Sequence, residues 1–156
     1  MIVKNSGTTL KTQYVYDADD RETQIQAKSK TLTTDYDALG RLDTKTWNAG
    51  TPFVTKYHYM AGANGSQSSQ VASVDIGSQK ITYTYDGNGN ITSITDSQGT
   101  TTYAYDELNR LVREDNRQLC KTVSYLYGQV GNIQKKCTYA LTTAQNSPEA
   151  PENGLY

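Results

Sequence analysis

The residues best able to do acid–base or nucleophilic chemistry in this chain are few. His58 is the only histidine among the 156 residues, so a Ser–His–Asp or Cys–His site would have to use it. It stands between Tyr57 and Tyr59 in a segment that reads as a strand, which places its side chain on the opposite strand face from theirs. No sequence pattern puts a nucleophile beside it. We interpret His58 as a surface residue and predict that the chain is not an enzyme.

An oxygen-rich stretch that could bind a metal has a simpler interpretation. The segment DGNGN, from Asp86 to Asn90, is similar to part of a calcium-binding loop, but the glutamate that completes such a loop is missing at the required distance. The other aspartates recur at positions that read as turns, where a carboxylate accepts backbone hydrogen bonds. We therefore predict a hairpin turn at this segment, with no metal and no cofactor.

The charge distribution argues against a nucleic-acid partner. The chain has 15 Lys plus Arg, 16 Asp plus Glu and a formal net charge of -1. Its basic residues are scattered, with Lys135 and Lys136 as the only dense spot, so the footprint of a phosphate-backbone binder is missing. No stretch approaches about 18 consecutive apolar residues, and the first residues, MIVKNSGTTLKTQ, lack the apolar run of a signal peptide. We expect no nucleic-acid partner, no membrane span and no signal peptide in this chain.

Tyrosine dominates the apolar residues. There are 13 Tyr against one Phe and one Trp, and hydrophobic residues make up 35% of the chain, with a mean hydropathy of -0.71. An aliphatic core of the usual kind cannot be assembled from this composition. Richness in Tyr, Thr, Val and Ile favours strands over disorder, so tyrosine rings are expected to do the packing in a β structure.

The tyrosines follow an internal repeat. Eleven of the 13 occupy the two tyrosine positions of a Tyr-x-Tyr pattern whose copies start 20 to 26 residues apart. Such spacing is typical of an array of short supersecondary units. The six copies are YVYDADDRE from Tyr14, TDYDALGRL from Thr34, YHYMAGANG from Tyr57, YTYDGNGNI from Tyr83, YAYDELNRL from Tyr103 and YLYGQVGNI from Tyr125.

Each copy reads as one β-hairpin. Tyrosines at positions i and i+2 lie on the same face of a strand because strand side chains alternate. Asp at i+3 and Gly or Asn at i+6 mark a turn, since Gly and Asn adopt positive φ most readily, and Leu or Ile at i+8 begins the returning strand. The residues that define the repeat are Tyr14, Tyr16, Asp17, Tyr36, Asp37, Gly40, Tyr57, Tyr59, Tyr83, Tyr85, Asp86, Gly89, Tyr103, Tyr105, Asp106, Asn109, Tyr125, Tyr127 and Gly131.

The repeats predict an all-β strip of consecutive antiparallel hairpins. One copy alone cannot be stable, because ordering its backbone costs more than burying two tyrosine rings returns, so neighbours must share strand ladders and ring contacts. We predict a lead-in strand over 1–13, the repeat array over 14–139 and a flexible linker over 140–156. The first copy departs from the pattern at Asp20 and Glu22, and the third at Met60, which precedes a longer Gly/Ser loop.

The pattern Y-x-Y-D-x-x-G-[RN]-[LI] at this spacing resembles the YD repeats of bacterial RHS-repeat and wall-associated proteins, of toxin complexes and of teneurins. The resemblance covers about residues 14–139 and is strongest in YTYDGNGNI and YAYDELNRL. It implies hairpins joined edge to edge into a curved strip, part of a β-shell that commonly encloses a C-terminal toxin or effector. With six copies and no counterpart of the family's self-cleaving closing segment, the chain is interpreted as a fragment of such a shell.

The resemblance implies a structural scaffold that is secreted or lies at the cell surface. The expected partners are adjoining YD repeats of a longer chain or another copy, and an enclosed effector. About twelve strands at about 4.8 Å give a strip about 58 Å wide, about a third of the circumference needed around a cargo of about 100 residues, so we expect a wall segment that cannot enclose an effector by itself. The alternative is a cell-surface carbohydrate-binding or adhesion module that uses exposed tyrosine ladders, and ring exposure would separate the two.

Two cysteines, Cys120 and Cys137, are the remaining candidates for chemistry. If the last repeat turns between Tyr127 and Asn132, Cys120 lies nearly opposite Tyr139 and diagonal to Cys137 on one face. A disulfide would then need only a small register shift, and secreted members of the resembled family would permit one. Two free thiols are an equal alternative for a chain kept in a reducing compartment.

Overall fold

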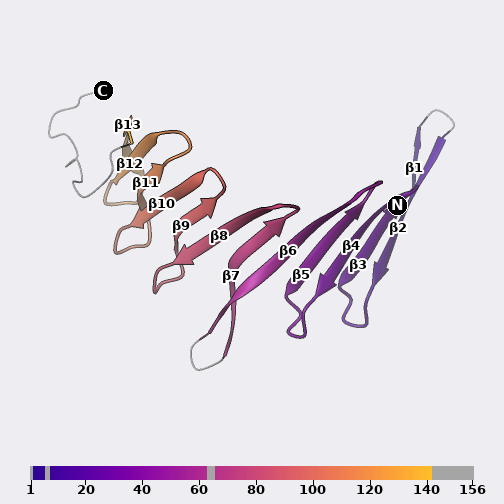
Figure 1. Ribbon diagram of the computed structural model, residues 1–156. Helices are drawn as coiled ribbons and strands as arrows, with labels where there is room; N and C mark the ends of the chain where they lie inside the picture. The colour runs from indigo at the N-terminus through magenta and orange to yellow at the C-terminus, as the bar shows by residue number, and fades with distance from the viewer. Residues whose placement is uncertain (1, 6–7, 63–65, 142–156) are drawn as a thin grey trace. The chain divides into compact units, whose positions relative to one another are not determined.

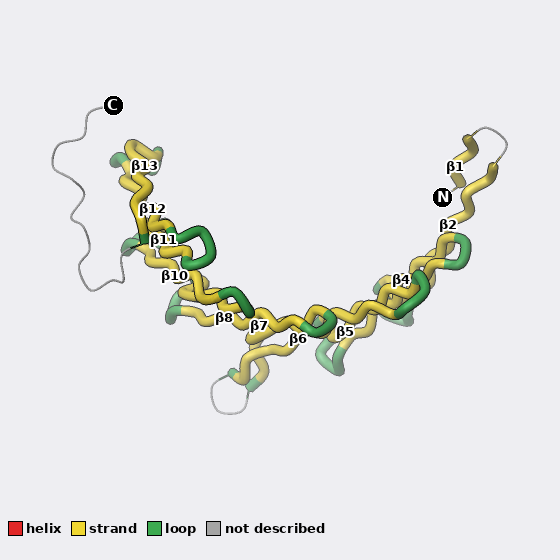
Figure 2. The backbone as a smooth tube through the Cα atoms, turned by 45° about the horizontal axis from the view of Figure 1, so that its top comes forward, coloured by secondary structure: helices red, strands yellow, loops and turns green. Residues whose placement is uncertain are grey.

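The structure is a computed structural model that describes residues 2–5, 8–62 and 66–141. Every helix or strand in these ranges is a β-strand, as Figures 1 and 2 show. The prediction of an all-β chain of consecutive antiparallel hairpins is confirmed. None of the described residues belongs to a helix long and apolar enough to cross a membrane.

The chain divides into two compact units, Met1–Ser97 and Gln98–Tyr156. In each unit the strands follow one another in sequence order, and each pairs antiparallel with its neighbour. The first unit contains β1 (Ile2–Asn5), β2 (Thr8–Tyr16), β3 (Glu22–Ala27), β4 (Lys30–Tyr36), β5 (Leu42–Asn48), β6 (Pro52–Ala61), β7 (Gln67–Ile76), β8 (Gln79–Tyr85) and β9 (Ile91–Asp96). The second contains β10 (Gly99–Tyr105), β11 (Leu111–Asn116), β12 (Lys121–Tyr127) and β13 (Ile133–Ala140).

Strand alternation gives the sheet of the first unit one face that is largely apolar and one that is largely polar. We call the face that bears the first tyrosine of each copy the tyrosine face. One row across it consists of Tyr14, Ile25, Leu32, Trp47 and Phe53, each directly opposite the next. A row on the other face consists of Gln13, Gln26, Thr31 and Asn48.

Little of either unit is fully buried, because a single layer of sheet has no second layer to cover it. Among the described residues, Val74 is the only buried hydrophobic one, and it lies directly opposite both Tyr57 and Ile81. In the second unit, Thr122 is buried and its hydroxyl donates a hydrogen bond to Asp115. The contacts that stabilise each unit therefore have to lie between its neighbouring hairpins rather than in a central core.

A β-bulge occurs where each YD strand approaches its turn. In all six copies the register shifts between i+1 and i+2, and in every copy except the third the second tyrosine lies opposite residue i+8. Residue i+9 is the extra residue of the bulge, which bends the strand and increases its twist locally. The five pairs are Tyr16 with Glu22, Tyr36 with Leu42, Tyr85 with Ile91, Tyr105 with Leu111 and Tyr127 with Ile133.

Three segments differ from the sequence-based expectation. The lead-in over 1–13 contains β1 and most of β2 rather than one strand, which brings the described strands to 13. The Gly/Ser loop expected after Met60 is partly strand, because Ala61 of β6 lies opposite Gln67 of β7, and its residues 63–65 lie outside the described residues. Met60 has no carboxylate to cap a turn at this point. The linker expected over 140–156 begins with Ala140 still in β13, and 142–156 lie outside the described residues.

Candidate functional site at the joints between repeats

Each YD turn is built around its aspartate. In the second copy the Asp37 N–H donates to the Arg41 carbonyl (2.8 Å), and the Gly40 N–H donates to the Asp37 carbonyl (2.9 Å). The Asp37 Oδ1 accepts the backbone N–H groups of Leu39 and Arg41, both at 2.9 Å. The same bonds recur around Asp17, Asp86 and Asp106. The carboxylate therefore satisfies backbone donors that a tight turn would otherwise leave unpaired.

Residue i+6 has a positive φ in these four turns and in the turn of the last copy, where Gly128 stands in place of the aspartate. The values are 60° at Asp20, 76° at Gly40, 87° at Gly89, 59° at Asn109 and 83° at Gly131. Gly adopts this conformation freely, and Asn and Asp tolerate it better than other side chains. Asp20 therefore fits the turn of the first copy, although it departs from the Gly of the sequence pattern.

Residue i+7 binds the second oxygen of the same aspartate. The Nε atoms of Arg21, Arg41 and Arg110 donate to the Oδ2 atoms of Asp17, Asp37 and Asp106, each at 2.7 Å. In the fourth copy the Asn90 side-chain amide donates to the Asp86 Oδ2 at 2.9 Å. Arg and Asn thus make the same contact, one with a charge and one without.

These hydrogen bonds lower the pKa of the turn aspartates. For Asp17 and Asp106 the backbone N–H of residue i+7 is the largest cause of the lowered pKa. For Asp86 it is the Asn90 side chain. Burial acts to raise the pKa of Asp37, but the hydrogen bonds from Arg41 and Leu39 outweigh it and the pKa is lowered. The four carboxylates are therefore ionised well below neutral pH.

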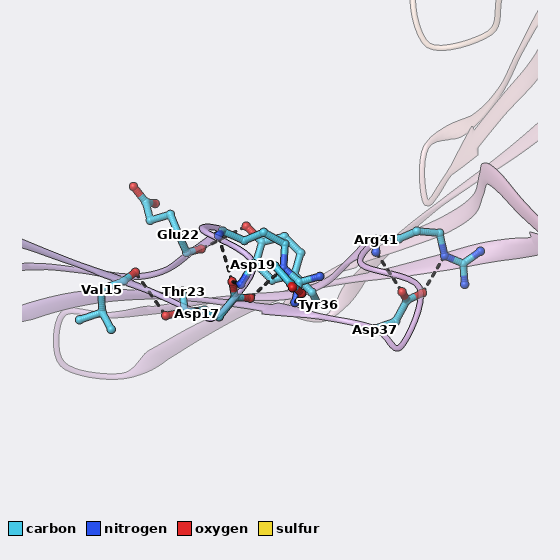
Figure 3. A network of polar contacts seen from close by, with 9 residues as sticks. Val15, Asp17, Asp19, Glu22, Thr23, Tyr36, Asp37 and Arg41 are labelled. Carbon is cyan, nitrogen blue, oxygen red and sulfur yellow. Dashed lines mark hydrogen bonds and ion pairs between the residues drawn. The ribbon is translucent and has the colours of Figure 1, made fainter.

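The three arginines also contact the following repeat. The guanidinium carbon lies over the ring of the next copy's second tyrosine, at 4.7 Å for Arg21 and Tyr36, 4.1 Å for Arg41 and Tyr59, and 4.6 Å for Arg110 and Tyr127. These distances to the ring centroid are those of cation–π contacts. Figure 3 shows Tyr36 beside the Asp17 turn, and the Asp37–Arg41 pair of the next copy. Each arginine therefore links the turn of one repeat to a ring of the next.

The hydroxyl of the same ring completes the link. It donates to the backbone carbonyl of residue i+8 in the preceding copy, at 3.1 Å from Tyr36 to Glu22, 2.7 Å from Tyr59 to Leu42 and 2.8 Å from Tyr127 to Leu111. We call this arrangement a joint: the turn aspartate, residue i+7 and the i+8 carbonyl of one copy, with the second tyrosine of the next. A joint uses one ring to bind a charge and a backbone acceptor of the neighbouring hairpin.

The joint between the third and fourth copies lacks an arginine. Tyr85 donates to the Val71 carbonyl at 2.8 Å, and Val71 takes the place of residue i+8 because it lies opposite Tyr59. The residue before it is Gln70. Burial raises the pKa of Tyr85, and also that of Tyr59, so both hydroxyls remain protonated donors well above neutral pH.

The two tyrosines of the pattern have different roles. The first one packs on the tyrosine face against the opposite strand, as Tyr57 does on Val74 and Tyr83 on Ile94. The second one makes the joint. The sequence pattern did not separate these roles, and it did not assign one to the arginines; the recurrence of Arg or Asn at i+7 was the signal that could have found them.

The other candidates for chemistry are His58 and the segment DGNGN. His58 Nε2 lies 2.7 Å from Asp75 Oδ2, and both side chains are partly exposed. DGNGN forms the turn of the fourth copy, as its Asp86 bonds indicate. Within the ranges that the structure describes, no three His, Cys, Asp or Glu side chains are grouped so as to hold a metal ion.

The two cysteines do not lie opposite each other in the second unit. Cys137 lies opposite Ser124, and Tyr139 lies opposite Thr122, so the expectation that Cys120 lies nearly opposite Tyr139 is wrong. Cys120 precedes β12 in a turn, and its carbonyl accepts the Leu141 N–H at 2.9 Å. The four residue steps from Cys137 to Leu141 span about 13 Å along a strand, too far for a disulfide. Both thiols are free, and a hydrogen bond with Cys137 raises the pKa of Tyr139.

Comparisons with known proteins agree with this geometry. A family model described as RHS Repeat matches residues 70–101 and 85–118. No curated protein matches the chain. Among solved structures, the crystal structure of TcdB2-TccC3 is similar with a TM-score of 0.51 at 16% identity, over 86% of this chain and 10% of that one. The crystal structure of TcdB2-TccC3-TEV gives 0.50 at 17% identity, over 86% and 9%.

The structural likeness concerns the fold, and the chain spans about a tenth of the length of those solved chains. The match to the repeat model falls on the copies in which the Tyr-x-Tyr-Asp pattern is most complete. The repeat pattern, the hairpin order and the fold thus agree with the RHS/YD-repeat family, whose model matches residues 70–101 and 85–118 of this chain.

Proposed function

We propose that the chain is a structural scaffold, a wall segment of an RHS/YD-repeat shell of the type that encapsulates a C-terminal toxin or effector. The observation that carries the proposal is the joint. Its residues bind one hairpin to the next: the turn carboxylate accepts three hydrogen bonds within its own hairpin, and the ring of the next repeat contacts a guanidinium and a backbone carbonyl. Such contacts stabilise a sheet that has no core of its own.

The partners we propose are adjoining YD repeats, in a longer chain or another copy, and an enclosed effector. The likeness to TcdB2-TccC3 supports this assignment through the fold. Since an open sheet edge leaves backbone donors and acceptors unpaired, a wall segment is expected to depend on neighbours at its edges. A secreted or cell-surface location follows from the same proposal.

We propose no catalytic role. His58 is the only histidine, and its Nε2 faces the carboxylate of Asp75 on the neighbouring strand. The turn aspartates accept hydrogen bonds from two backbone N–H groups and from the side chain at i+7, which uses three of the about four acceptor positions of each carboxylate. A histidine and carboxylates engaged in this way fit a scaffold better than an acid–base site.

The alternative of a carbohydrate-binding module on exposed tyrosine ladders has less support. The second tyrosines of four joints donate their hydroxyls to backbone carbonyls. Three of these rings also lie under a guanidinium. A ring that is occupied on its face and at its hydroxyl has little left to offer to a sugar.

Native mass spectrometry and limited proteolysis test the shell proposal. The chain would be produced with a protease-sensitive reporter polypeptide fused to its C-terminus, alone and together with further YD repeats. We expect the reporter to be cleaved with the chain alone and to be protected once repeats complete the wall. A closed monomer of the isolated chain that protects the reporter, or a reporter that stays cleavable in the extended array, would refute it.

A further inference from the structure

Tyr16 has the position of a joint tyrosine but no partner. It is the second tyrosine of the first copy, and the second tyrosine makes a joint in four other copies. Tyr16 is 55% exposed, and its hydroxyl makes no hydrogen bond with any of the described residues. The side chain therefore presents one half of a joint at the outer edge of β2.

The four complete joints follow one rule of register. In each of them, the ladder between the returning strand and the next YD strand ends at a last pair. The carbonyl of the joint belongs to the residue two positions before that pair, and the tyrosine lies three positions after it. The last pairs are Gln24 with Thr33, Thr44 with Lys56, Ser73 with Thr82 and Arg113 with Ser124. A ladder must therefore reach the residue three positions before a second tyrosine if that tyrosine is to meet its acceptor.

The strand β1 covers too little of β2 to complete the joint of Tyr16. Its four residues all pair with β2, and the last described pair is Ile2 with Lys11. The rule requires the ladder to reach Gln13, two positions farther along β2. No other described strand pairs with this edge of β2. The outer edge over residues 12–16 is thus open to a longer strand.

The strand β13 carries the other half of a joint. It is the returning strand of the sixth copy, and β12 is its only partner among the described strands. After the bulge, Ile133 lies opposite Tyr127 just as Leu111 lies opposite Tyr105, and the Leu111 carbonyl is the acceptor of a complete joint. Ile133 is 56% exposed. Its carbonyl therefore occupies the acceptor position at an open edge.

We propose that β13 of one copy pairs antiparallel with β2 of a second copy, and that the Tyr16 hydroxyl donates to the Ile133 carbonyl. The inference rests on the proposed role as a wall segment, and it specifies which edges meet when the partner is another copy. The sixth copy has Gly128 in place of the turn aspartate, so this joint consists of the hydroxyl–carbonyl bond that the complete joints share. Because two different edges meet, the association is head to tail and continues into larger assemblies instead of stopping at a symmetric dimer.

The register of this pairing follows from the joint. The rule places Lys135 opposite Gln13 as the last pair, and a ladder of six pairs runs from there to the end of β13 opposite the start of β2. The faces of the two strands then match, because Lys136 and Thr12 are both on the tyrosine face, whereas Lys135 and Gln13 are both on the other face. No pair of this ladder places like charges opposite each other, which would be unfavourable.

The strand β1 acts as a cap on the same edge of β2. It pairs with residues 8–11, which the ladder with β13 also needs. It supplies four pairs and no joint, whereas β13 supplies six pairs and the Tyr16 joint. Because β1 belongs to the same chain as β2, it competes at an effective concentration of about a millimolar, as expected for a short connection. The cap therefore keeps copies apart when they are dilute and is displaced when they are concentrated.

Breaking the cap in the intact chain should strengthen the association. Val3 lies within β1, opposite Leu10, and Val3→Pro removes a backbone donor and disfavours the strand. We expect sedimentation velocity to show assemblies at an about tenfold lower protein concentration than for the wild type, because the cap no longer competes. Val3→Thr keeps the donor and the strand propensity, and it should associate like the wild type.

Two matched variants of the Val3→Pro chain test the joint. Tyr16→Phe removes only the hydroxyl and is expected to weaken the association about fivefold, which corresponds to one hydrogen bond. Tyr14→Phe removes the hydroxyl of the first tyrosine of the same copy, which is 43% exposed and makes no joint. It should associate like its parent.

Disulfide cross-linking tests the register. In the proposed ladder Cys137 lies opposite Lys11 of the second copy, and residues directly opposite each other are within the Cα distance of a disulfide. In a chain that also carries Cys120→Ser, Lys11→Cys is therefore expected to cross-link copies in the presence of oxidised glutathione. Thr12→Cys places the thiol on the other face of β2 and is the control, which should cross-link much more slowly.

Three results would overturn the inference. They are association of the Val3→Pro chain at the same concentration as the wild type, equal effects of the two phenylalanine variants, and cross-linking of Lys11→Cys no faster than that of Thr12→Cys. Circular dichroism of each variant separates loss of association from loss of fold. A reporter that added repeats protect while copies fail to associate would leave the wall proposal standing without this inference, and association without protection would do the opposite.

Discussion

The second and third joints of the first unit make the same connection with different side chains. At the joint between the second and third copies, Tyr59 donates to the Leu42 carbonyl and lies under Arg41. At the next joint, Tyr85 donates to the Val71 carbonyl at nearly the same distance, and Gln70 stands where the other joint has Arg41. The hydroxyl–carbonyl bond is therefore common to both, and the guanidinium is an addition.

The difference between the two joints distinguishes three groups of contacts. The turn is set by its aspartate and by a residue with positive φ at i+6. The joint is set by the ring at i+2 of the next copy and by the carbonyl at i+8. The arginine couples these two, because it binds the carboxylate of its own turn and the ring of the following repeat. Each of these three groups of contacts can be removed separately by one substitution.

Removing a joint ring should have the largest effect. We expect Tyr59→Ala and Tyr85→Ala each to lower the free energy of unfolding by about 2 to 3 kcal/mol, through lost burial and a lost hydrogen bond. Tyr59→Ala should cost slightly more, because Arg41 also loses its ring contact. Urea unfolding followed by circular dichroism measures both. Tyr16→Ala is the control, because Tyr16 is 55% exposed; an equal loss there would contradict the importance of the joint.

Adding one methyl group to the glycine at i+6 should have the second-largest effect on the free energy of unfolding. Gly40 has a φ of 76°, and a Cβ there would lie 2.9 Å from the Arg21 Nη1 of the preceding copy. Gly40→Ala therefore combines backbone strain with displacement of Arg21, and we expect a loss of about 2 kcal/mol. Gly131 has a φ of 83° and open space around the added Cβ, so Gly131→Ala should cost about 1 kcal/mol.

Thermal or urea unfolding of the two alanine variants checks this difference. Gly131→Asn should be nearly neutral, since Asn109 occupies the same position of another copy with a φ of 59°. If Gly40→Ala and Gly131→Ala cost the same, the guanidinium of one copy does not constrain the turn of the next.

Local signals made most of the hairpin predictable. The Tyr-x-Tyr period fixed the faces of the strands, and Asp followed by Gly or Asn located the turns, because both are set within a few residues of chain. The joint is not local: Tyr59 contacts Leu42 and Arg41, which are 17 and 18 positions earlier. Since the spacing of copies varies, no fixed offset in the sequence marks these partners.

The bulge explains why register was the weakest prediction. One extra residue at i+9 shifts the returning strand relative to the YD strand. In the last copy, Tyr127 lies opposite Ile133 whereas Leu126 lies opposite Lys135. A hairpin drawn without the bulge misplaces the partners farther along β12 and β13, which is how Cys120 came to be expected near Tyr139. The residue type at i+9 differs from copy to copy in this chain, so the sequence pattern did not predict the bulge.

Converting one joint into the other should have a smaller effect. Arg41→Gln gives the second joint the side chain of the third, and we expect a loss of about 1 kcal/mol from the cation–π contact and the ion pair. Arg117→Gln, at an exposed arginine in the turn before β12, is the control and should be silent. A double-mutant cycle of Arg41→Gln with Tyr59→Leu measures the coupling; no coupling would mean that the guanidinium serves its own turn alone.

The smallest expected difference is in the loss of stability in acid between a turn with Arg at i+7, as at Asp37, and a turn with Asn at i+7, as at Asp86. The folded pKa values of Asp37 and Asp86 are both lowered, whereas in the unfolded chain an aspartate has a pKa of about 3.9. A lowered folded pKa contributes stability that is present above the unfolded value and is lost as the pH falls through the folded one. The urea midpoint should therefore be flat from about pH 7 to 5 and fall below about pH 4.

Asp37→Asn and Asp86→Asn should each lower the midpoint at neutral pH and make its decline in acid shallower. We expect the change to be larger for Asp37, because its carboxylate faces the charged Arg41, whereas that of Asp86 faces the neutral amide of Asn90. Glu107→Gln, at an exposed residue of the fifth turn, serves as the charge-matched control. Equal acid profiles for the two asparagine variants would show that the backbone hydrogen bonds of the turn, rather than the residue at i+7, hold the carboxylate ionised.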